Sequence, residues 1–262
     1  MATMDTIIDR GDPRGLPVLF LHGFPFSQEM WQGQLEAMPP EFRAIAYDLR
    51  GLGCSDRGDG QYTIEGHVDD LIALMGRLRI PGAVLVGLSM GGYIALRALD
   101  RNPERILGAV LCDTRSEADT DEVKLRRAAQ IKDVKASGSA AFAEGFLPAI
   151  FAQETFSKNP EAVAKIRDVI IKTPPLSIAG TLLALAARSD TTSSLGKIQV
   201  PTLILVGEKD KVTPPDAARA MHQKIPGSQL EILPGAGHMS NLENPEVFNR
   251  HLLNFLRSFP NR

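Results

Sequence analysis

A serine between glycines lies at position 89, in the stretch Gly87-Leu-Ser-Met-Gly91. The apolar run before it predicts a strand, and the residues after it predict a helix. A G-x-S-x-G sequence between a strand and a helix is typical of a sharp turn that exposes a nucleophilic serine hydroxyl. Because the turn is tight, the residues two before and two after the serine must be small, and both are glycine. The pattern predicts that Ser89 is a catalytic nucleophile; the alternative is a glycine-rich packing turn.

A serine hydroxyl needs a base to remove its proton, and that base needs an acid to orient it. His238 lies in a glycine-containing loop after the predicted strand Gln229–Leu233, and Asp210 follows the predicted strand Thr202–Val206. Residues that follow parallel strands meet at one edge of the sheet, where such folds place their active sites. We therefore expect Asp210 and His238 to meet Ser89. The alternatives are a turn-forming aspartate and a surface histidine.

Charge develops on the carbonyl oxygen when a serine attacks an ester, and two backbone N–H groups must already point at that oxygen. The N–H of Met90, the residue after the nucleophile, is one candidate. The loop after the predicted strand Val18–Leu21 supplies the second through the N–H of Phe24. Pro25 has no N–H and stiffens this loop. We interpret His22 as a residue that holds the loop in place.

Several motifs in a fixed order carry a resemblance to a known family. They are Phe20-Leu-His-Gly-Phe-Pro25, Asp48-Leu-Arg-Gly-Leu-Gly-Cys-Ser55, Gly87-Leu-Ser-Met-Gly-Gly92, Gly207-Glu-Lys-Asp210 and Gly237-His238. The chain resembles the α/β-hydrolase superfamily over nearly its whole length, and it is most similar to the small bacterial esterase, enol-lactonase and perhydrolase-like branch. The resemblance implies an α/β fold: a mostly parallel, doubly wound sheet with a helical cap inserted after the sixth strand. It also implies a cofactor-independent triad of Ser89, Asp210 and His238, with oxyanion donors at Phe24 and Met90.

The resemblance raises a second candidate for the acid, because some members carry their carboxylate after the strand that corresponds to Leu107–Cys112. Asp113 lies there, but we expect it to cap the following segment or to form hydrogen bonds within its loop. One departure from the family pattern lies at the start of the chain. Only Thr6–Asp9 could form a strand before Pro17, so the usual first antiparallel hairpin is expected to be shortened. A serine at the elbow also argues against the dehalogenase and epoxide hydrolase branches, which carry aspartate there.

Strand-like and helical segments alternate over residues 1–114 and 197–262, which is typical of a parallel sheet with helices on both faces. The predicted strands are Val18–Leu21, Ala44–Tyr47, Ala83–Val86, Leu107–Cys112, Thr202–Val206 and Gln229–Leu233. Between them, residues 115–196 show no convincing strand and are too long for an ordinary connection. We expect this block to form a helical cap over Ser89. Its predicted helices are Asp121–Ser137, Ser139–Leu147, Pro160–Thr173 and Pro175–Arg188.

Apolar side chains from the core and the cap are candidates for the substrate pocket. They are Phe24, Phe26, Trp31, Phe142, Phe146 and Met239. The alternative is that the phenylalanines of the cap pack against one another. By analogy with the fold, a capped and rather small pocket predicts acyl chains of about two to six carbons. Arg115 is a weaker candidate for binding a substrate carboxylate.

Composition excludes several classes of function. The 262 residues include 29 basic and 31 acidic side chains, with a net charge of −2, so no basic patch predicts binding to nucleic acid. No apolar run is long enough to span a membrane, and the first ten residues lack the features of a signal peptide. Cys54 and Cys112 have no metal-ligand spacing and are not expected to form a disulfide. We expect a cytoplasmic enzyme with no metal and no cofactor, acting on a small ester or lactone; the oligomeric state is left open.

Ester hydrolysis through an acyl-enzyme is the favoured function, and three alternatives remain. Lactone or enol-lactone hydrolysis would use the same triad and would need a cation such as Arg115 for the substrate carboxylate. Perhydrolysis would replace water with peroxide, and Pro25 lies where perhydrolase-like relatives carry proline. A ligand-binding receptor without turnover is the alternative from a different class, and the complete triad argues against it.

Overall fold

The computed structural model describes residues 7–260. Seven strands in these residues form one sheet in the order β1-β3-β2-β4-β5-β6-β7. β1 is antiparallel to β3, and the other neighbouring strands are parallel. All the predicted strands are present, several of them slightly longer than expected. The strands are β1 (Ile7–Gly11), β2 (Leu16–Leu21), β3 (Phe42–Tyr47), β4 (Ala83–Leu88), β5 (Ile106–Cys112), β6 (Thr202–Gly207) and β7 (Gln229–Leu233).

The antiparallel edge of the sheet is short. β1 pairs with β3 from Ile7, opposite Tyr47, to Gly11, opposite Arg43. Thr6, the first residue of the predicted edge strand, lies outside the described residues, as does most of the segment considered for a signal peptide. Within residues 7–260 the helical insertion follows β5, the fifth strand, because a single strand is described ahead of β2. In the family pattern, whose first hairpin is not shortened, the strand before the insertion is the sixth.

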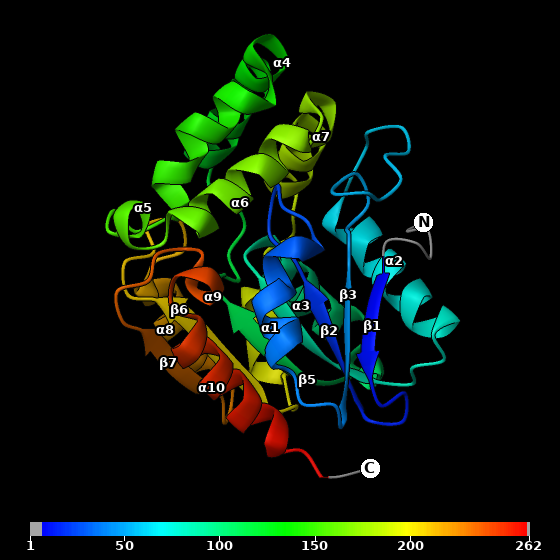
Figure 1. Ribbon diagram of the computed structural model, residues 1–262. Helices are drawn as coiled ribbons and strands as arrows, with labels where there is room; N and C mark the ends of the chain where they lie inside the picture. The colour runs from blue at the N-terminus through cyan, green and yellow to red at the C-terminus, as the bar shows by residue number, and fades with distance from the viewer. Residues whose placement is uncertain (1–6, 261–262) are drawn as a thin grey trace.

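Helices cover both faces of the sheet. Figure 1 shows α1 and α10 in front of the sheet, where they pack against each other, while α2 packs against α3. Helix α2 begins after Thr63, whose hydroxyl accepts a hydrogen bond from the N–H of Gly66, and such caps fix where a helix starts. The helices of this part are α1 (Gln32–Ala37), α2 (Ile64–Arg77), α3 (Met90–Arg101), α8 (Pro215–Lys224), α9 (Ser240–Glu243) and α10 (Pro245–Arg257).

The block between β5 and β6 contains helices and no strand. Figure 1 shows these helices, which we call the cap helices, grouped above one edge of the sheet. Gly138, with φ 82° and ψ 173°, breaks the first of them where the sequence predicts a boundary between two helices. The cap helices are α4 (Asp121–Ile150), α5 (Thr155–Lys158), α6 (Pro160–Lys172) and α7 (Pro175–Ala186). The division into a core and a cap at residues 115 and 196 stays a prediction.

The central strands are apolar along their whole length because both of their faces are covered. Every residue of β4 and of β6 is buried, as expected for parallel strands between two helical layers. Val134, Leu147 and Ile150 of α4 belong to the same apolar cluster as the sheet, so the cap helices pack directly on the core. Among residues 7–260 no single helix could span a membrane. Helices α6 and α7 together are long and apolar enough, but they meet at a bend of 99°.

Candidate active site

Ser89 lies in a strained turn between β4 and α3. Its φ of 53° and ψ of −111° are unfavourable for an L-residue, and its N–H donates to the carbonyl oxygen of Cys112 at 2.9 Å. A Cβ atom at Gly87 would lie 2.3 Å from the carbonyl oxygen of Gly91. A Cβ atom at Gly91 would lie 2.1 Å from the carbonyl oxygen of Leu21. Side chains are therefore excluded at both positions, as the sequence pattern predicts.

Asp210 and His238 form a buried pair at the ends of β6 and β7. The Nδ1 of His238 lies 2.8 Å from the Oδ2 of Asp210. The N–H groups of Val212 and Thr213 donate to Oδ1 at 2.8 and 3.0 Å, and the Thr213 hydroxyl donates to Oδ2 at 2.7 Å. Burial raises the pKa of Asp210, but the charge of His238 and the hydrogen bonds from His238 and Thr213 bring it below its ordinary value. An ionised Asp210 can therefore orient the His238 ring through Nδ1–H.

Ser89 and His238 both line one cavity. Because Asp210 engages Nδ1, the Nε2 of His238 is the ring atom left to act as a base toward Ser89. In the part of the chain that the structure describes, no hydrogen bond joins the Ser89 hydroxyl to this ring. Hydrogen bonds of this kind often tighten only when substrate is bound.

Asp113 is a second buried carboxyl group near the triad. It is fully buried at φ 45°, its Oδ1 accepts the N–H of Gly207 at 2.8 Å, and the Ser240 hydroxyl contacts its Oδ2. Burial and then the charge of Asp210 raise the pKa of Asp113 well above its ordinary value. Asp113 thus ties the ends of β5 and β6 to α9, and it has no hydrogen bond to His238 among the described residues. Its role is structural, as expected, but its partners lie on β6 and α9 and not within its own loop or at the start of α4.

The loop after β2 presents Phe24 at the cavity. His22 is buried behind it; Nδ1 donates to the carbonyl oxygen of Gly23, and Nε2 accepts the N–H of Leu49, both at 2.9 Å. Burial lowers the pKa of His22, which favours the neutral ring that these two bonds require. Within residues 7–260, the N–H groups of Phe24 and Met90 have no acceptor. Both are therefore free to bind an oxyanion.

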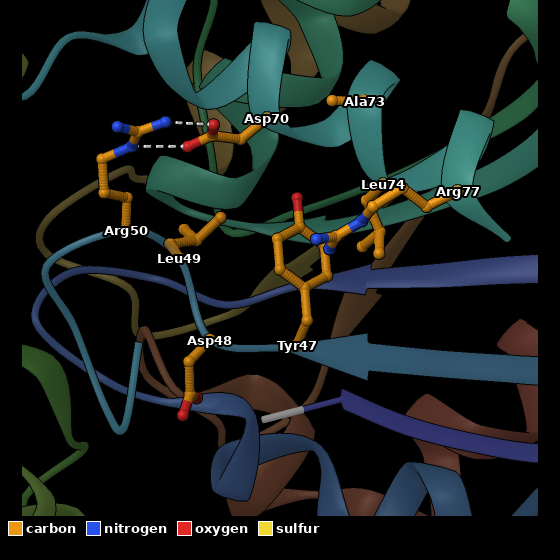
Figure 2. Close-up of a pocket in the computed structure, with 8 residues that line it drawn as sticks. All are labelled: Tyr47, Asp48, Leu49, Arg50, Asp70, Ala73, Leu74 and Arg77. Atoms are coloured by element: carbon orange, nitrogen blue, oxygen red, sulfur yellow. Dashed lines mark hydrogen bonds and ion pairs between the residues drawn. The ribbon is translucent and has the colours of Figure 1, made fainter. Parts of the chain in front are cut away.

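The motif Asp48–Ser55, which follows β3, is hydrogen-bonded to the segment that follows Phe24. Asp48 accepts the N–H groups of Gln28 and Cys54, both at 2.8 Å. Figure 2 shows Asp48 turned away from the ion pair between Arg50 and Asp70, which ties the same segment to α2. The pocket drawn there has a volume of about 10 Å³, room for about one water molecule. This motif therefore builds the scaffold and offers no substrate site.

The loop that carries His238 is bonded to the cap helices as well as to the core. The backbone N–H of His238 donates to the carbonyl oxygen of Ile150 at 2.9 Å. The side chain of Glu243 joins the same two segments. Its carboxylate accepts four hydrogen bonds, from the N–H groups of Gly237, Met239 and Ala152 and from the hydroxyl of Thr155. The sequence analysis missed Glu243, whose one signal is its position five residues after the histidine.

A cavity of about 890 Å³ lies between the sheet edge and the cap helices, and it is larger than the small pocket that the sequence predicted. Phe24, Phe142 and Phe146 contribute to its lining. The Phe24 ring lies 6.0 Å from that of Phe142 and 5.9 Å from that of Phe146, measured between centroids. These three rings form one apolar wall of the cavity.

The structure does not bring the other predicted pocket residues, Phe26, Trp31 and Met239, to this cavity. All three are fully buried in the core. Trp31 packs between Phe20 and Phe248, which explains why its ring is unavailable to a ligand. Among residues 7–260, no group of three or more His, Cys, Asp or Glu side chains could hold a metal ion.

The family model for the alpha/beta hydrolase fold matches residues 17–245. The chain belongs to the α/β-hydrolase family. This hydrolase is 28% identical to 3-oxoadipate enol-lactonase 2 of Acinetobacter baylyi, over 92% of its own length and 89% of the relative.

Two solved structures share this fold closely. A thermophilic esterase from Thermogutta terrifontis has a TM-score of 0.92 and 40% identity, over 96% of this chain and 92% of that one. The enol-lactonase from Burkholderia xenovorans LB400 has a TM-score of 0.90 and 30% identity, over 96% of both chains. The predicted family, fold class and branch are thereby confirmed.

Proposed function

We propose that this hydrolase cleaves small carboxylic esters through an acyl-enzyme on Ser89. The observation that carries the proposal is the buried Asp210–His238 pair, which opens into the same cavity as the strained serine. His238 removes the hydroxyl proton through Nε2 while Ser89 attacks the ester carbonyl. Asp210 fixes the tautomer of the ring and stabilises the imidazolium that forms.

The remaining steps use the same groups. The N–H groups of Phe24 and Met90 bind the oxyanion, and one such donor is worth about 2.7–4 kcal/mol of barrier. His238 protonates the leaving alcohol, and it then activates the water that releases the acid. The esterases and lactonases among the relatives support this reaction class. In this proposal residues 115–196 form the cap that encloses the substrate.

The test is a comparison of the wild type with Ser89→Ala on a series of p-nitrophenyl esters. We expect turnover to fall to the background rate at every chain length. A fluorophosphonate probe should label the wild type at Ser89, as located by peptide mass. Ser157→Ala, at an exposed serine of the cap helices, is the matched control and should keep full activity. Wild-type rates in Ser89→Ala would end the proposal.

Lactone hydrolysis is a second candidate, favoured by the size of the cavity and by the presence of Arg115 in its lining. Relatives named enol-lactonase support the same reading. The measurement is ring opening of a lactone panel at constant pH by the wild type and by Ser89→Ala. Perhydrolysis stays a prediction, and formation of peracid from acetate and peroxide would test it.

A further inference from the structure

The lining of the active-site cavity carries an excess of basic side chains. Five basic side chains and two carboxylates contribute to its lining, an excess of three positive charges in a chain whose net charge is −2. The basic residues are Arg115, Arg126, Arg127, Arg188 and Lys211, and the acidic ones are Asp119 and Asp133. A cavity lined mainly by one sign of charge attracts ligands of the opposite sign and raises their local concentration.

The innermost cations share one carboxylate. Asp119 contacts Arg127 and also accepts a hydrogen bond from the Nη1 of Arg188 at 2.6 Å. The side chain of Arg188 is 3% exposed, and its guanidinium lies 4.3 Å from the ring centroid of Tyr93. Tyr93 is one helical turn after Ser89, and its N–H donates to the Ser89 carbonyl oxygen. Two arginines thus share one carboxylate, and one positive charge is left uncompensated beside Tyr93 in the cavity lining.

Two further cations lie close to the acid of the triad along the chain or through a hydrogen bond. Arg115 donates from Nη2 to the carbonyl oxygen of Val212 at 2.8 Å, which fixes its guanidinium and leaves other N–H donors unused. Lys211 is exposed and directly follows Asp210. Neither Arg115 nor Lys211 forms an ion pair with any carboxylate in residues 7–260. Both are therefore open to an anionic ligand.

We infer that the cavity selects esters that carry a second, anionic group, a carboxylate, and that Arg115 and Lys211 bind it. The aromatic wall at Phe24, Phe142 and Phe146 receives the hydrocarbon part of the same substrate. Charge-assisted hydrogen bonds from a guanidinium and an ammonium group suit a carboxylate. The inference rests on the proposed ester hydrolysis at Ser89 and adds the substrate class.

The test uses pairs of esters that differ in charge and hardly in shape. Monomethyl glutarate and methyl glutaramate carry a carboxylate or a carboxamide on the acyl side. Acetoxyacetate and acetoxyacetamide carry the same two groups on the alcohol side. Acid release at constant pH gives kcat/KM for each ester. In at least one pair we expect the anionic ester to be preferred by about tenfold or more, and less so at high salt.

Substitutions assign the preference to residues. Arg115→Gln and Lys211→Gln should each lower the ratio of kcat/KM, anionic over neutral, by about threefold or more. Lys132→Gln is the matched control, because Lys132 is an exposed lysine of α4 outside the cavity lining. It should leave the ratio unchanged. Lys211 is exposed, so this variant should fold normally even if Arg115→Gln does not.

The outcomes separate this inference from the proposed function. Ratios of one or below in the wild type, with the esters still hydrolysed at Ser89, would overturn the inference and leave the ester hydrolase standing. A ratio that survives both substitutions would refute the assignment to Arg115 and Lys211. If none of the four esters is hydrolysed and a fluorophosphonate does not label Ser89, the proposed function and the inference fail together.

Discussion

Replacing Asp210 with asparagine should disable His238 without displacing it. The Oδ1 of Asp210 receives two N–H donors, from Val212 and Thr213, so the amide must keep its oxygen at that position. The NH₂ group then takes the place of Oδ2, which lies 2.8 Å from the Nδ1 of His238. It would donate to Nδ1, and the ring proton would move to Nε2. No base would then face Ser89.

The magnitude follows from this wrong tautomer. In a Ser-His-Asp triad the same substitution lowers kcat by about 10⁴-fold, which corresponds to about 5.5 kcal/mol of barrier. The Thr213 hydroxyl can both donate and accept, so it can turn to accept from the new NH₂ group. We therefore expect Asp210→Asn to unfold near the wild-type temperature while losing nearly all of its activity.

Asp113→Asn is the matched comparison, because Asp113 is the other buried carboxyl group at this edge of the sheet. The raised pKa of Asp113 favours its neutral carboxylic acid, and the NH₂ group of an asparagine can donate to the Ser240 hydroxyl as that acid would. We expect a loss of less than about tenfold in kcat/KM for p-nitrophenyl butyrate. The reasoning would be refuted if Asp210→Asn kept a tenth of the wild-type rate, or if Asp113→Asn lost as much as Asp210→Asn.

Three further predictions concern the turn, the acid stability and the histidine loop. Gly91→Ala should destabilise the fold by at least about 2 kcal/mol, because its Cβ would lie 2.1 Å from a backbone carbonyl oxygen; a change below about 1 kcal/mol in urea unfolding would contradict this. Burial lowers the pKa of His67 to about 4, whereas a histidine in the unfolded chain has a pKa of about 6.5. As the pH falls between these two values, the unfolded chain therefore binds a proton on His67 that the folded chain does not bind. Stability should fall by up to about 3 kcal/mol over that window, and His67→Phe should flatten the profile in thermal unfolding measured against pH; a profile as steep as that of the wild type would count against a neutral His67. In Glu243→Gln, the new NH₂ group faces a backbone N–H that the carboxylate accepts in the wild type, so a hydrogen bond of the histidine loop is lost. His238 is then repositioned, and kcat should fall about tenfold with little change in KM. The exposed Glu246→Gln should change neither constant, and equal effects of the two variants would refute the special role of Glu243.

Residues whose placement depends on local backbone could be predicted from the sequence. The turn at Ser89 needs small residues at Gly87 and Gly91, because their Cβ atoms would collide with backbone a few residues away or in the neighbouring strand. Asp210 and His238 follow buried strands, and parallel strands bring such positions to one edge. Gly138 marks the break in α4 for the same kind of local reason, since its φ is positive.

The lining of the cavity was decided by tertiary packing. The side chains of Phe26, Trp31 and Met239 are apolar, as is typical of pocket residues, but they are fully buried in the core. Asp119 meets an arginine 69 residues further along the chain, and this pairing exists only because α7 packs beside α4.

The sequence by itself thus determined the fold class, the strained turn and the strand ends that hold the candidate triad, because these depend on short-range sterics and on apolar periodicity. The docking of the cap helices on the sheet decided which charges and rings face Ser89. That docking sums many weak contacts between segments far apart in the chain, and no local pattern encodes their direction.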